Sequence, residues 1–484
     1  MTPLASLPRA AGTGFPRAVP ACHADSRAAP LPPVGRATLL ASGCGTAIAA
    51  VCASGIVVIT QQVQGAWASL AIVCGGALAF ALARCFAQLA EHIPGSSGLL
   101  AYLGRGLGRD AALIVALPYL LLSLFLVGAE ASVVGLLLSR VLPVPSLACA
   151  IGFVVCTWLL CRQGVTLSLR LQAMCTWALL AGLGACALAA LAQAVASGHL
   201  LPRLAASPPT VDRFAAAVAQ SLFLFMGFEL ITSQTGPVPA RTLRHALQGS
   251  ALVLTAFYAL LALGFLASDL PHLATSSTLP QLQLAQQAAG GPAVLLITLL
   301  SLLASYTSFN GALLALSRLT AALANMGCVP RRLARLDGRS LLPRQAMFAL
   351  LLFCIGSTLL IHAAGLLWAA IVAAAPTAAL VYAAAVWTRE GLPIDRAADP
   401  RGPRPASPRP RWRRLLGYAL AVVLCGLAVA VLGSIAQPAA ARSPSGPPAS
   451  PLHVGAIVTA AYALSIALVL RRRAQSRRLR RSYP

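Results

Sequence analysis

The chain has 484 residues, of which 58% are hydrophobic and only 10% are charged. Soluble domains carry about 25% charged residues, so this composition excludes an ordinary soluble protein and predicts one that crosses a membrane several times. The formal net charge of +25 comes from 36 basic residues, all of them Arg. They gather in alternate loops between apolar segments, which is a topology signal and not a nucleic-acid-binding surface.

Apolar segments of spanning length recur along the chain. We expect twelve transmembrane helices, near residues 38–61, 67–90, 111–138, 147–161, 171–196, 214–236, 248–267, 292–324, 346–361, 366–387, 415–435 and 453–470. With the N-terminus in the cytosol, the external loops hold only Arg140, Arg203, Arg213 and Arg442, and every other Arg lies inside. The positive-inside rule therefore predicts an even number of spans with both termini in the cytosol.

The sixth segment contains the least usual sequence, Phe225-Met226-Gly227-Phe228-Glu229. A Gly leaves a helical backbone free to unwind, and a Glu at membrane depth needs a cavity or a partner. Together they predict a helix that is broken near the bilayer midplane to bind a polar ligand. The alternative for Glu229 is a protonated side chain hydrogen-bonded to a neighbouring helix.

Inverted repeats place a counterpart of this break in the first span, and the small residues Ala53, Ser54 and Gly55, followed by Ile56, stand there. A half-helix that begins at these residues would direct its backbone N–H groups at an anion such as a carboxylate. The alternative is that the small residues form a packing face against another helix.

Four stretches resemble bacterial amino acid permeases of the amino acid–polyamine–organocation (APC) superfamily. They are Ala53-Ser54-Gly55-Ile56, Phe225-x-Gly227-x-Glu229, residues 87–90 with 94–98 and Tyr102, and Ser317-Arg318 with residues 325–330. The resemblance covers roughly residues 39–387. It implies an all-α polytopic membrane protein with a five-plus-five inverted repeat (LeuT-like), discontinuous helices 1 and 6, and two extra helices.

Composition and the apolar segments also indicate a domain organisation, and the resemblance implies a substrate site. We expect a disordered cytosolic tail (1–37), a ten-helix core (38–388), a Pro/Arg-rich cytosolic loop (389–414), two additional helices (415–470) and a basic cytosolic tail (471–484). The substrate-binding residues carried over by motif are Ala53, Ser54, Gly55, Ile56, Phe225, Gly227 and Glu229. Gln88, Asn325 and Met326 depart from the family's pattern.

Energy coupling needs a different group from the one that some relatives use. In those relatives a Lys of the fifth helix serves proton coupling, and this chain has no Lys. Glu130, in the third segment, is the other acidic residue well inside an apolar run and is the candidate for binding and releasing a proton. A purely structural hydrogen bond is the alternative for Glu130.

The function predicted is secondary active transport of an amino acid or related amine across a bacterial inner membrane by alternating access, proton-coupled or by exchange. An amino acid exporter and a transporter-like ligand sensor are the alternatives. A membrane enzyme is disfavoured, because the sequence has no metal-ligand spacing, nucleophile motif or phosphate loop. The expected partners are the substrate, the lipid bilayer and protons as a candidate coupling ion, with no nucleic acid, cofactor or metal.

Overall fold

The computed structural model describes residues 35–93, 98–163, 165–234, 238–268, 279–337, 342–391, 411–436 and 451–481, and these contain helices and no strand. The long helices are α3 (Ala66–His92), α5 (Arg109–Leu138), α6 (Ser146–Cys161), α7 (Val165–Ala196), α11 (Ala240–Ala267), α13 (Pro280–Asn325), α14 (Arg344–Ala364), α15 (Leu367–Gly391), α16 (Arg411–Ala436) and α17 (Pro451–Arg481). Shorter helices are α1 (Arg36–Ala47), α2 (Val51–Gln62), α4 (Gly98–Leu107), α8 (Leu200–Leu204), α9 (Val211–Phe225), α10 (Ile231–Gln234) and the 3-10 turns η1 (Phe228–Leu230) and η3 (Arg331–Ala334).

The order of these helices follows the apolar segments of the sequence. Among the described residues, nine helical segments are long and apolar enough to cross a membrane, and the pair α1 and α2 passes the same test as one bent span. The fourth and eleventh expected spans coincide with shorter apolar helices, Ser146–Cys161 and Arg414–Val429. The all-helical, multi-pass fold predicted from composition is confirmed.

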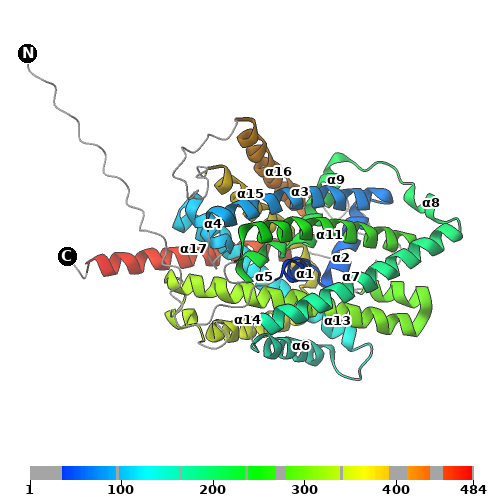
Figure 1. Ribbon diagram of the computed structural model, residues 1–484, viewed down its shortest axis with the longest axis horizontal. Helices are drawn as coiled ribbons and strands as arrows, with labels where there is room; N and C mark the ends of the chain where they lie inside the picture. The colour runs from blue at the N-terminus through cyan, green and yellow to red at the C-terminus, as the bar shows by residue number, and fades with distance from the viewer. Residues whose placement is uncertain are drawn as a thin grey trace, which may run out of the picture. The chain divides into compact units, whose positions relative to one another are not determined.

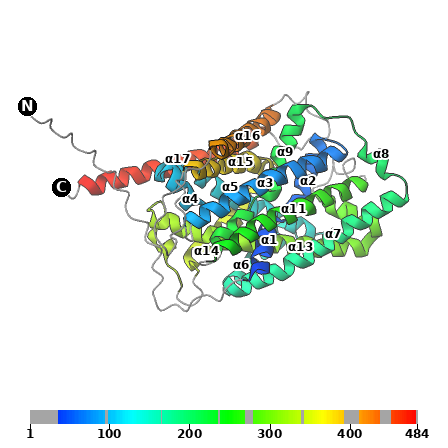
Figure 2. The same cartoon turned by 45° about the horizontal axis from the view of Figure 1, so that its top comes forward.

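Two spans lose their helical path, and they are five spans apart. The first span bends by 60° between α1 and α2. The sixth is interrupted between α9 and the short helices η1 and α10. These are the discontinuous helices 1 and 6 of the expected inverted-repeat architecture. In Figures 1 and 2, α1 lies inside the bundle, and it packs against α7, α11 and α13.

The last two long helices lie on one side of the bundle, against α15 (Figure 2). α17 also packs against α5, where Arg472 and Arg473 form ion pairs with Asp110 at 2.8 and 2.7 Å. The helix continues to Arg481, so the segment expected to be a basic tail extends the last span by about three turns.

Other predicted boundaries fall partly outside the description. Residues 1–34 and 392–410, which make up most of the expected tail and Pro/Arg-rich loop, are not described. The same holds for residues 94–97, which belong to the family-like stretch of residues 87–90 and 94–98. The division into a ten-helix core and appended parts therefore stays a prediction.

Candidate functional site

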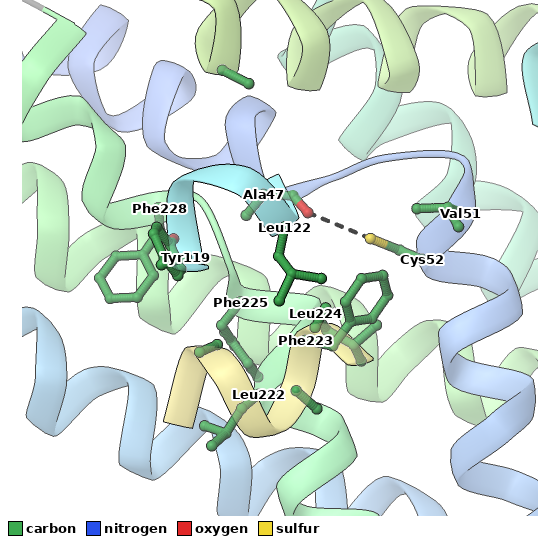
Figure 3. Packing of buried hydrophobic residues seen from close by; sticks show 14 of the residues in the cluster. Ala47, Val51, Cys52, Tyr119, Leu122, Leu222, Phe223, Leu224, Phe225 and Phe228 are labelled. Carbon is green, nitrogen blue, oxygen red and sulfur yellow. Dashed lines mark hydrogen bonds between the residues drawn. The ribbon is translucent and has the colours of Figure 1, made fainter. Parts of the chain in front are cut away.

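The first break lies between Ala47 and Val51. The chain leaves the helical path there, and the Cys52 thiol donates to the Ala47 carbonyl at 3.4 Å (Figure 3). The backbone N–H groups of Ala50 and Val51 donate to the two carboxylate oxygens of Glu130, at 2.8 and 3.2 Å. The first N–H groups of any helix have no partner within it. Glu130 of α5 therefore satisfies the positive end of the half-helix α2.

Glu130 is fully enclosed at this position. Its side chain is 3% exposed, and the Ser305 hydroxyl of α13 also donates to its Oε1. The carboxylate thus accepts three hydrogen bonds, two from backbone N–H groups and one from a hydroxyl. A buried carboxylate persists only where such donors replace its water.

The structure corrects the predicted position of the first break. Ala53, Ser54, Gly55 and Ile56 lie inside the helix α2, and the break comes earlier, at residues 48–50. Gly55 serves packing instead, because a Cβ at this position would lie 2.8 Å from the ring of Phe223 on α9. The sequence assigns the N–H groups at the start of the half-helix to Ala53–Ile56, whereas in the structure they belong to Ala50 and Val51 and are bonded to Glu130.

The second break lies where the sequence predicts it. α9 ends at Phe225 and Met226 is extended. Gly227 has a φ of 108°, a backbone conformation that residues with a Cβ rarely adopt. A Cβ on Gly227 would also lie 2.9 Å from the carbonyl oxygen of Thr46. Gly227 is required here both for its backbone conformation and for the close approach of the two broken spans.

Glu229 is held beside this break by three donors. Tyr119 donates to Oε1, and the Tyr382 hydroxyl and the Gly227 N–H each donate to Oε2 at 3.1 Å. Glu229 is 2% exposed. Sequence reasoning missed both tyrosine partners. A signal for one of them existed, because Tyr119 precedes Glu130 by about three helical turns and so shares its face of α5.

A cavity of about 70 Å³ lies between the two breaks. The first break contributes Thr46, Ala47, Ala49, Val51 and Cys52, the second contributes Met226, Gly227 and Leu230, and the remaining lining comes from Tyr119, Ser123, Leu126, Val127, Glu130, Phe223, Ser308, Phe309 and Ala312. None of these lining residues is basic. The cavity therefore combines residues from both broken spans with one carboxyl group, that of Glu130.

The predicted site residues separate into two groups. Gly227 and Glu130 line the cavity, whereas Glu229 lies behind it and contacts its wall through Tyr119. Phe225 is fully buried and packs edge-to-face on Tyr258, with ring centroids 5.9 Å apart. Phe223, two residues before Phe225 on α9, lines the cavity instead.

A cluster of uncharged amides joins α1 to the helices around it. Gln172 of α7 and Gln234 of α10 both donate to the Thr46 hydroxyl, at 3.2 and 2.8 Å. The Ser42 hydroxyl donates to Gln234 at 2.5 Å, and Asn310 of α13 donates to Gln172 at 3.1 Å. The half-helix α1 is therefore held by hydrogen bonds between uncharged side chains.

Three solved transporters share this arrangement of helices. A manganese transporter from Eremococcus coleocola has a TM-score of 0.56 at 14% identity, covering 92% of this chain and 94% of its own. A Na+-coupled sialic acid symporter has 0.54 at 12%, with 90% of each chain covered. A nucleobase-cation-symport-1 family transporter with bromovinylhydantoin bound has 0.51 at 17%, covering 91% and 93%.

At these identities the likeness shows the fold, which is that of LeuT-type secondary transporters. The sequence itself matches the amino acid permease family over residues 38–460, and the chain therefore belongs to that family. None of the curated proteins matches the sequence. The class of protein is thus a multi-pass membrane transporter.

The second break can be tested through its Gly. We expect Gly227→Ala to lower the unfolding temperature of the purified protein, because the added Cβ is strained at φ of 108° and meets the Thr46 carbonyl. The cost is about 1–3 kcal/mol. Gly356→Ala is the matched control, since nothing lies within 4 Å of its Cβ position. Equal unfolding temperatures for the two variants would contradict the geometry of the break.

Proposed function

We propose that this protein carries an amino acid or related amine across the bacterial inner membrane by alternating access. The observation that carries the proposal is the cavity between two broken spans, lined by residues of both and by Glu130. Membership of the amino acid permease family supports the substrate class. The structural neighbours named above serve other cargoes, so the shared fold does not select the substrate.

The chemistry of the cavity suits a zwitterion. The start of α2 presents N–H groups that bind a carboxylate, and the end of α1 presents carbonyl groups that accept from an ammonium. One of these carbonyls, that of Ala47, accepts from the Tyr258 hydroxyl at 2.9 Å, and that of Thr46 accepts from Ser308 at 3.2 Å. The ammonium group of a substrate can replace such hydroxyl donors.

Glu130 is our candidate for proton coupling. It lines the cavity, whereas Glu229 is bonded to two tyrosines behind the cavity wall. A carboxyl group beside the substrate exchanges protons with whichever side of the membrane the cavity opens to. Exchange of one substrate molecule for another remains the second mode of transport, and Glu229 keeps a role at the second break.

Transport into proteoliposomes tests the function and the coupling group together. We expect radiolabelled amino acids to accumulate when the outside is acidic. Glu130→Gln should keep substrate-for-substrate exchange and lose this accumulation, because an amide cannot titrate. Glu91→Gln, which alters a partly exposed ion pair with Arg244, is the control and should behave as wild type.

Other outcomes of this assay assign the role elsewhere. Accumulation that survives in Glu130→Gln but fails in Glu229→Gln would transfer proton coupling to Glu229. Accumulation that survives in both variants would contradict proton coupling through either carboxyl group. Failure of every amino acid and amine to enter, with or without a gradient, would refute the proposed substrate class.

The proposed orientation places both termini in the cytosol, which the Arg distribution favours. We expect alkaline phosphatase to be inactive when fused after Arg481 and active when fused in the loop between α7 and α9, because the enzyme folds only outside the cytosol. The control is a fluorescent protein fused at the same two positions. It should fluoresce at the C-terminus and stay dark in the loop between α7 and α9. Active phosphatase at the C-terminus would overturn this orientation.

A further inference from the structure

The N–H groups at the start of α2 already have a partner, the carboxyl group of Glu130. Glu130 comes from a different helix, 80 residues along the chain from Ala50, and both of its oxygens are used at this one place. The same carboxylate lines the cavity. A substrate carboxylate that approached these N–H groups would therefore meet a site that a carboxylate of the protein occupies.

We infer that Glu130 acts as an internal substitute for the carboxylate of the substrate. In the empty site, ionised Glu130 binds the N–H groups of Ala50 and Val51. When Glu130 takes up a proton, it releases these groups to the carboxylate of the substrate. Proton and substrate then bind together. This inference rests on the proposed function and narrows the substrate to a molecule with a carboxylate.

Electrostatics makes the two carboxylates exclude each other. Two like charges that share one pair of donors repel strongly in a site removed from water. Protonation removes one of the charges, and the resulting carboxylic acid needs an acceptor for its new O–H. The Ser305 hydroxyl, which donates to Glu130 in the empty site, can reverse its role, because a hydroxyl both donates and accepts.

Of the titratable groups in this part of the cavity, we expect only Glu130 to change its charge near pH 7. Cys52 on α2 and Tyr258 on α11 interact with it electrostatically. On its own helix, Tyr119 lines the same cavity and connects it to Glu229. Ser305 is its partner from α13 and does not titrate. Thiols and phenols are neutral near pH 7, and no lining residue of the cavity is Arg or His.

The inference predicts how affinity changes with pH. Only the protonated fraction of the empty protein can bind a substrate carboxylate, so the apparent Kd should rise about tenfold per pH unit wherever empty Glu130 is ionised. An amine without a carboxylate does not compete with Glu130 for the N–H groups. Its Kd should therefore not rise in this way as the pH increases.

The test uses the full-length protein in nanodiscs, with the twenty L-amino acids and the amines formed by their decarboxylation as probes. For each amino acid that binds, calorimetry between about pH 5 and pH 8 should show the tenfold slope and the uptake of close to one proton. In Glu130→Gln the Kd should vary less than about twofold over this range. Glu91→Gln is the control and should keep the wild-type slope.

The possible results distinguish a failure of this inference from a failure of the proposed function. Amino acid binding to wild type without the slope, or the same slope in Glu130→Gln, would overturn the inference and leave the proposed function standing. Amines that bind with the same slope as their parent amino acids would also overturn it. The comparison of amino acid with amine needs only wild type, so poor folding of a variant does not block the test. Failure of all probes to bind would refute the proposed function.

Discussion

The structure depends on how backbone groups are satisfied where two membrane spans stop being helical. Within the hydrocarbon region no water is available, so each unpaired N–H or C=O costs several kcal/mol. Two buried glutamates supply the missing partners, Glu130 at the start of α2 and Glu229 beside Gly227. Each accepts three hydrogen bonds, which explains why a chain with only 11 acidic residues keeps two of them at membrane depth.

A single helix connects the two breaks. Glu130 and Tyr119 both lie on α5, and their spacing of about three turns puts them on one face. Glu130 bonds the first broken span, while Tyr119 bonds Glu229 at the second. The two breaks also touch directly, since Gly227 allows the chain to approach the Thr46 carbonyl closely. A change in the hydrogen bonds of either glutamate therefore occurs close to both broken spans, one from each repeat.

Much of this architecture follows from local sequence, and the rest depends on distant contacts. Gly227 and Glu229 predict the second break because a Gly and a buried acid in an apolar segment both have a local cost. The sequence places the first break too late, because Ala53, Ser54 and Gly55 lie inside α2 and Gly55 leaves room for the ring of Phe223. The break at residues 48–50 has no Gly or Pro to mark it. What stabilises it is Glu130, and no local pattern reveals a partner 80 residues away.

The groups that hold the first broken span respond differently to protons. On one side of the break, α1 is bound through Ser42 and Thr46 to the amides of Gln172 and Gln234, which keep the same charge at every physiological pH. On the other side, α2 is bound by a carboxylate, whose charge depends on pH. In the proposed coupling, a proton taken up by Glu130 therefore acts on α2 and leaves the amide contacts of α1 in place. The chain has no Lys that could titrate beside this break, so the proposed coupling assigns the pH response of this span to Glu130.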